Sequence, residues 1–289
     1  MNVTFKKKRR WYLVLTAILG CLACLGIQRS LFCWLENHRG NFVAPLGLEI
    51  SLIRLQNIQK LKGDTLMMGS SITERFRSND TTAVLGIPGN SFVSGLELME
   101  NVVEFPAGTT YILETNNILN EPNELVLVDA RKWDFRVFRG SPHFSVAAKP
   151  SNLILSYLEF ILRPGADYSS TNCDAVPSLS PEPLVQVNDM TAEEQTEWRR
   201  VIDGVRKIRQ KGGRICMVRL PVSDASRYQA SYEAACKIAK FAQIPVLNYN
   251  TPYWRNSLHF PDGTHLDSRA RSTSMFRDVI VRDAKNCAR

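Results

Sequence analysis

Short apolar runs that alternate with longer amphipathic segments constrain the fold of this chain more than any other feature. The runs suit buried strands, and the segments between them carry apolar residues at helical spacing. The strands are expected at residues 65–69, 82–86, 109–113, 214–220 and 244–247. The helices are expected at residues 71–77, 90–104, 191–210, 225–242 and 267–284. Because each helix must return the chain over the sheet, this order predicts an α/β fold with a doubly wound, flavodoxin-like parallel sheet and helices on both faces.

The alternation stops between residues 120 and 190, where seven prolines are scattered. We interpret this stretch as an insertion over one edge of the sheet, with one apolar helix at residues 152–162. A chain of 289 residues with 44% hydrophobic content is long enough for one main domain with an appended segment. The main domain is expected at residues 61–289, after a linking or helical stretch at residues 28–60.

The N-terminus has the composition of a membrane anchor. Five basic residues at positions 6–10 form a basic flank within residues 1–10, and residues 11–27 then contain no charge. Such a run is at the short limit for a spanning helix, and positive flanks stay cytoplasmic. We therefore expect a single-pass anchor with the main domain outside the cytoplasm, in a periplasmic or other extracytoplasmic space. A cleaved signal peptide, or a lipoprotein signal at Cys21, is the open alternative.

Charge and cysteine usage exclude two other classes of protein. Five of the eight excess positive charges lie in the basic flank, so the rest of the chain has a net charge of only +3 and gives no argument for nucleic-acid binding. Three of the seven cysteines lie in or just after the apolar run, and the four in the main domain form no C-x-x-C pair and have no histidine cluster nearby, which argues against a zinc site. One disulfide is allowed but not implied, and Cys216 is expected to be a buried thiol.

Gly69-Ser70-Ser71 marks the first candidate site, because it ends a strand and opens a helix. In an open parallel sheet, ligands bind beyond the carboxyl ends of the strands, so a serine here is exposed at the functional edge. Its own backbone N–H also faces an anion held beside the helix N-terminus. The alternative is purely structural: Ser71 and Glu74 have the spacing of a helix capping box.

Asp262 and His265 form the second candidate site, after the last strand and before the last helix. A histidine takes a proton from a serine only in the right tautomer, and a carboxylate three residues earlier can fix that tautomer. The alternative is an ordinary turn in which His265 only caps or packs.

Two further strand ends carry candidate donors for an oxyanion. Gly89 follows the second strand and allows a backbone N–H to approach a developing negative charge closely. Asn116 follows the third strand and carries an amide N–H donor. Their structural alternatives are a simple turn and an Asx turn. Together with Ser71, these residues are the candidate oxyanion hole.

The ordered series of motifs resembles the SGNH, or GDSL-like, hydrolase family across residues 64–284, with the insertion excepted. Gly69-Ser70-Ser71 is similar to the family's Gly-Asp-Ser block, Gly89 to its oxyanion glycine and Asn116 to its third-block asparagine. Asp262-x-x-His265 is similar to the block with the remaining triad members. This sequence departs from the pattern at Ser70, where Asp is usual, and at Glu114, where Gly is common. It also lacks the Asn that often opens the family's second block.

The resemblance implies a serine ester hydrolase or O-acyltransferase with Ser71, His265 and Asp262 as its triad. The Gly-Ser-Ser variant with an anchor is similar to envelope members that handle acyl groups on cell-surface polymers. An acyl-ester substrate, with a carbohydrate as one candidate, and a membrane acyl-transfer protein are then the expected partners. This chemistry requires no cofactor and no metal. A catalytically inactive scaffold protein on the same fold is the alternative.

Overall fold

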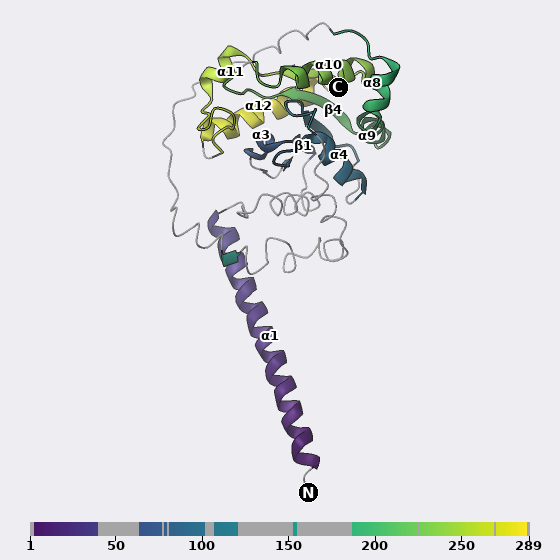
Figure 1. Ribbon diagram of the computed structural model, residues 1–289. Coiled ribbons are helices and arrows are strands. Elements are labelled where there is room, and N and C mark those ends of the chain that lie inside the picture. Colours follow the sequence, from purple (N-terminus) through teal and green to yellow (C-terminus); the bar gives the residue numbers. More distant parts are fainter. Residues whose placement is uncertain are drawn as a thin grey trace.

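The computed structural model describes residues 3–39, 64–76, 78–79, 81–101, 107–120, 153–154, 187–224, 226–268 and 270–287. A long helix, α1 (Val3–Arg39), projects from an α/β body that contains the other described elements (Figure 1). Within the predicted insertion helix at residues 152–162, residues 153–154 are helical and the others lie outside the described residues, as does most of the predicted linker.

A five-stranded sheet forms the centre of the body, and its strands are all parallel. In chain order the strands are β1 (Thr65–Gly69), β2 (Thr82–Gly86), β3 (Thr110–Glu114), β4 (Arg214–Arg219) and β5 (Val246–Asn248). The spatial order is β2-β1-β3-β4-β5. All five agree with the predicted strands to within one or two residues at each end, because continuous apolar runs suit strands that are covered on both faces.

Alternate residues of each strand belong to two separate cores, one on each face of the sheet. Leu66, Met68 and Tyr111 lie in the first core, together with buried residues of α4 (Phe92–Asn101), α9 (Arg199–Gln210) and α10 (Gln229–Ala242). Met67 and Cys216 lie in the second core, against α12 (Arg271–Cys287). The predicted burial of the Cys216 thiol is confirmed. Helices therefore pack on both faces of the sheet.

The helices differ from the prediction at several points. The helix predicted at residues 71–77 ends at Glu74, and the helix predicted at residues 267–284 begins only at Arg271. The helix predicted at residues 191–210 is two helices, α8 (Ala192–Glu197) and α9, because the backbone at Trp198 leaves helical geometry. Helix α10 begins only at Gln229, after Tyr228 adopts a left-handed conformation. A short helix, α11 (Pro252–Ser257), was not predicted; it starts at a Thr251 cap with proline in its first turn.

Helix α1 contains a segment, Val14–Leu31, that is long and apolar enough to cross a membrane. The segment overlaps the predicted anchor at residues 11–27 but begins and ends a few residues later. Close to its C-terminal end, Leu31 and Trp34 pack against a cluster of buried residues that includes Leu153.

Candidate active site

The carboxyl ends of the central strands bring the predicted motifs to one edge of the sheet. Gly69 at the end of β1 pairs with Gly86 at the end of β2, and Glu114 at the end of β3 pairs with Val218 of β4. The chain enters the short helix α3 (Ser71–Glu74) directly after β1. This register places the residues that follow β1, β2 and β3 beside one another.

Ser70, and not Ser71, caps helix α3. The Ser70 hydroxyl accepts a hydrogen bond from the backbone N–H of Ile72 at 3.1 Å, and Ser70 is buried. The capping box that Ser71 and Glu74 would form, which was the structural alternative for this motif, is therefore not the arrangement here. Because Ser70 takes the capping role, the hydroxyl of Ser71 is available for another partner.

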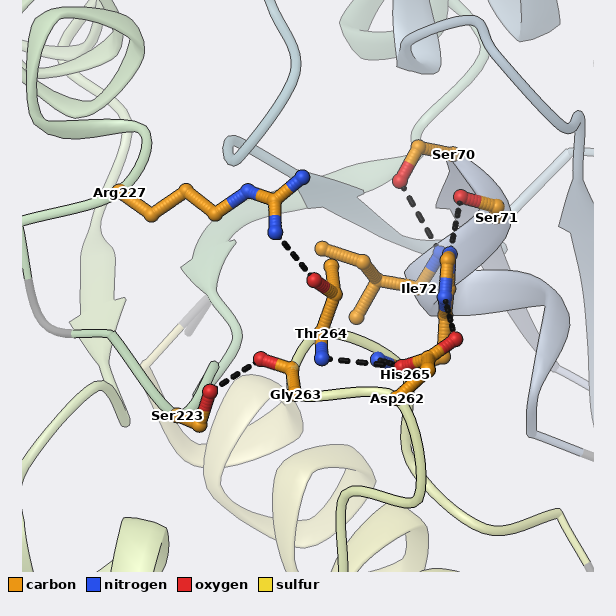
Figure 2. Close-up of polar contacts among 9 residues, drawn as sticks. All are labelled: Ser70, Ser71, Ile72, Ser223, Arg227, Asp262, Gly263, Thr264 and His265. Atoms are coloured by element: carbon orange, nitrogen blue, oxygen red, sulfur yellow. Dashed lines mark hydrogen bonds and ion pairs between the residues drawn. The ribbon is translucent and has the colours of Figure 1, made fainter.

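That partner is the imidazole of His265, which lies 194 positions away in the sequence. The distance from Ser71 Oγ to His265 Nε2 is 2.8 Å, and His265 Nδ1 lies 2.6 Å from Asp262 Oδ2 (Figure 2). A hydroxyl, a ring and a carboxylate thus form one hydrogen-bonded line. The close approach of these three side chains, which the sequence led us to expect, is present.

The two carboxylate oxygens of Asp262 have separate partners. Oδ1 accepts the backbone N–H groups of Thr264 at 2.9 Å and His265 at 2.7 Å, which closes the turn, while Oδ2 faces the imidazole. Burial alone would raise the pKa of Asp262, but these hydrogen bonds and the nearby imidazole lower it below the ordinary value. Asp262 therefore keeps its charge well into the acidic range.

Two contacts that sequence reasoning missed hold the loop that carries Asp262 and His265. The Ser223 hydroxyl donates to the carbonyl of Gly263, and the Arg227 guanidinium donates to the Thr264 hydroxyl (Figure 2). Both partners come from the segment between β4 and α10. No local motif in the sequence marks these contacts, because they depend on two distant loops meeting.

The triad lies at the surface and not in the interior. The side chain of His265 is 24% exposed and that of Asp262 is 51% exposed, while Ser71 is half-buried. All three residues are therefore in contact with solvent.

No model of a known protein family matches this chain, and no curated protein matches it. The resemblance to a family therefore rests on the sequence motifs alone.

The structure gives Asn116 a structural contact in addition to its predicted role. The side chain is fully buried, its amide N–H donates to the carbonyl of Leu220 at 2.9 Å, and its oxygen accepts the Leu220 N–H at 2.8 Å. The amide thus joins the ends of β3 and β4. One amide hydrogen remains beyond this pair, so the predicted oxyanion role of Asn116 stays a prediction.

Gly89 lies on the exposed turn after β2 and has a positive φ of 72°. Its carbonyl accepts a hydrogen bond from the Asn120 side chain, in the turn that follows β3. Glycine suits this conformation, so the turn alone accounts for the residue. Its predicted role as an oxyanion donor, like that of the Ser71 N–H, also stays a prediction.

We expect Asn116→Ala to lower the free energy of unfolding by about 1–3 kcal/mol, because both backbone groups of Leu220 lose a buried partner. Urea unfolding of the detergent-solubilised protein measures this loss. If the remaining amide hydrogen also binds an oxyanion, kcat falls by about 100- to 1000-fold in addition. Asn117→Ala, at the next buried position, is the control. An unchanged stability of the Asn116 variant would contradict the structural role.

Glu114 is a buried residue that the sequence analysis treated only as a departure from a pattern. Its carboxylate accepts hydrogen bonds from Ser70 and Thr73, on either side of Ser71. Burial raises the pKa of Glu114, and the hydrogen bonds from Thr73 and Ser70 oppose that rise. A charged residue directly after an apolar strand was the available signal for such a network.

Other candidate ligands near the site have ordinary structural partners. Trp254, considered from the sequence as a platform for a sugar ring, is buried in the second core, whereas its neighbour Tyr253 is partly exposed. Arg255 donates to the carbonyl of Asn250. Trp133 and His143 lie outside the described residues. Within the described ranges, no group of three or more His, Cys, Asp or Glu side chains converges as a metal site would require.

Proposed function

We propose that this protein is a serine ester hydrolase or O-acyltransferase of the SGNH type, with the doubly wound, flavodoxin-like sheet of that family. The observation that carries the proposal is the line from Ser71 to His265 to Asp262, with heavy-atom distances of 2.8 Å and 2.6 Å. Both distances are within the range for a nucleophile with its general base and for a base with its orienting group.

In the proposed reaction, Ser71 Oγ attacks the carbonyl carbon of an ester while His265 Nε2 takes the hydroxyl proton. Asp262 holds the Nδ1 proton and stabilises the imidazolium. The tetrahedral oxyanion is bound by the N–H groups of Ser71 and Gly89 and by the remaining amide hydrogen of Asn116. The imidazolium then gives its proton to the leaving alcohol, which produces an acyl-enzyme. Water completes hydrolysis, and a sugar hydroxyl completes transfer.

A fluorophosphonate probe tests this proposal on the full-length protein in detergent. We expect covalent labelling at one serine, and peptide mapping places it at Ser71. Hydrolysis of p-nitrophenyl acetate should disappear in parallel with labelling. A protein that is neither labelled nor able to hydrolyse the ester would support the scaffold alternative and contradict the enzyme proposal.

The segment Val14–Leu31 leads us to propose that the protein is a single-pass membrane protein whose α/β body lies outside the cytoplasm. The basic flank at residues 6–10 supports this orientation. We expect the full-length chain to stay in the membrane pellet after an alkaline carbonate wash, and protease added from outside to digest the body. Release of a shortened chain into the supernatant would indicate a cleaved signal instead.

A further inference from the structure

Glu114 is a buried carboxylate that the proposed reaction does not use. It is 2% exposed and lies at the end of β3, beside the turn that carries Ser71. Its oxygens accept the Ser70 N–H at 2.7 Å, the Thr73 hydroxyl at 2.7 Å, the Ser70 hydroxyl at 2.8 Å and the Thr73 N–H at 3.2 Å. Four donors on two residues thus surround one carboxylate.

The donors belong to residues on both sides of the nucleophile. Ser70 precedes Ser71, and Thr73 follows it by two positions, so the carboxylate fixes both ends of the segment that contains Ser71. The approach is so close that a Cβ on Gly69 would lie 2.3 Å from Thr73 Oγ1 and 2.4 Å from Glu114 Oε2. Only glycine fits at position 69. The turn that carries Ser71 therefore packs directly against the end of β3.

The contact also links two of the departures from the GDSL-like pattern. Ser70 stands where that pattern has Asp, and Glu114 stands where it has Gly. In this structure the two side chains touch each other. A carboxylate is therefore still present beside the nucleophile, but the neighbouring strand supplies it.

We propose that Glu114 is a positioning residue that holds Ser71 in line with His265, and that Ser70 and Glu114 are a compensating pair. The proposal rests on the proposed ester chemistry. Glu114 acts through the turn and does not contact the reacting atoms. A shift of Ser71 by about 1 Å is enough to cost on the order of 100-fold in rate, so the effect should be measurable as a loss of kcat.

The test compares four full-length proteins in detergent: wild type, Glu114→Gln, Ser70→Asp and the double variant Ser70→Asp/Glu114→Gly. In Glu114→Gln, the amide N–H groups of the new side chain face the N–H and O–H donors of Ser70 and Thr73. In Ser70→Asp, the new carboxylate lies beside that of Glu114. Each single change should lower kcat for p-nitrophenyl acetate by about 100-fold with little change in KM. The double variant should recover to within about 10-fold of wild type, because an aspartate at the N-cap position accepts the helix N–H groups itself.

Thermal unfolding is measured on the same samples, and the rate of fluorophosphonate labelling is measured far below the melting temperature. Glu100→Gln, on the surface of α4, is the matched control and should keep the wild-type kcat. If Glu114→Gln does not fold, Thr73→Val replaces it, since that change removes one hydroxyl donor from the same carboxylate. The Thr73 variant should lower kcat by about 10-fold.

Two results would overturn the positioning role in an active protein. One is a Glu114 or Thr73 variant that melts at a lower temperature but keeps wild-type kcat and labelling rate. The other is a double variant no more active than the single ones. A wild-type protein that neither hydrolyses the ester nor takes the label would instead overturn the proposed function, and this inference with it.

Discussion

Replacing Ser71 by alanine is expected to lower kcat for p-nitrophenyl acetate by a factor on the order of 10⁵ to 10⁶. In the proposed mechanism, the change removes the oxygen that forms the acyl-enzyme, while His265 and Asp262 are unchanged. Ser71 is a small residue that is not fully buried, so the melting temperature should stay close to that of wild type. Steady-state kinetics and probe labelling of the full-length protein measure the loss.

Ser70→Ala is the discriminating control, because Ser70 is the adjacent serine. Its hydroxyl is buried and bonded to Glu114, so it cannot reach a substrate from solvent. The Ser70 variant should keep probe labelling at Ser71 and lose at most about 100-fold in rate through the turn. If Ser70→Ala abolished labelling and Ser71→Ala did not, the nucleophile would be Ser70 and not Ser71.

Replacing Asp262 by asparagine is expected to lower kcat by about 10⁴-fold, with a smaller change in KM. An amide at this position can donate to Nδ1 of His265, which favours the tautomer that cannot accept the Ser71 proton. The pKa of Asp262 in the wild-type protein lies below the ordinary value for an aspartate, which is near 4. The carboxylate therefore stays charged at every pH above that value, and the charge is lost only at a lower pH. The deficit of the variant should therefore persist unchanged from pH 6 to pH 8.

A second Asp–His pair in the same loop offers a matched control. His259 Nδ1 lies 3.5 Å from Asp267 Oδ2, but neither residue is part of the line to Ser71. Asp267→Asn should keep kcat within a few-fold of wild type once its folding has been checked by thermal unfolding. Equal losses in the two variants would mean that loop stability, and not tautomer control, explains the effect of Asp262.

The strands could be predicted because each is a continuous apolar run with small or polar residues at its ends. In a parallel sheet that is covered on both faces, burial of every side chain leaves a plain signal in the sequence. Helix ends were less predictable: Trp198 and Tyr228 have backbone conformations that no residue type dictates.

The triad could be predicted as a set of residues, because Ser71, Asp262 and His265 each stand at a strand end or loop with suitable chemistry. The roles of Ser70 and Asn116 could not be. Both are polar residues beside the site that the structure uses to join elements, Ser70 with Glu114 and Asn116 with Leu220. Such pairings connect positions 44 and 104 residues apart, and nothing local in the sequence marks them.

The long helix α1 has a consequence for how the protein would meet a substrate. If α1 spans the bilayer and the proposed function holds, the anchor keeps the sheet edge that carries Ser71 close to the lipid surface. The search for substrate then takes place in two dimensions, by lateral diffusion. Molecules held in or near the same leaflet would be favoured over those free in bulk solution, whatever acyl group they carry.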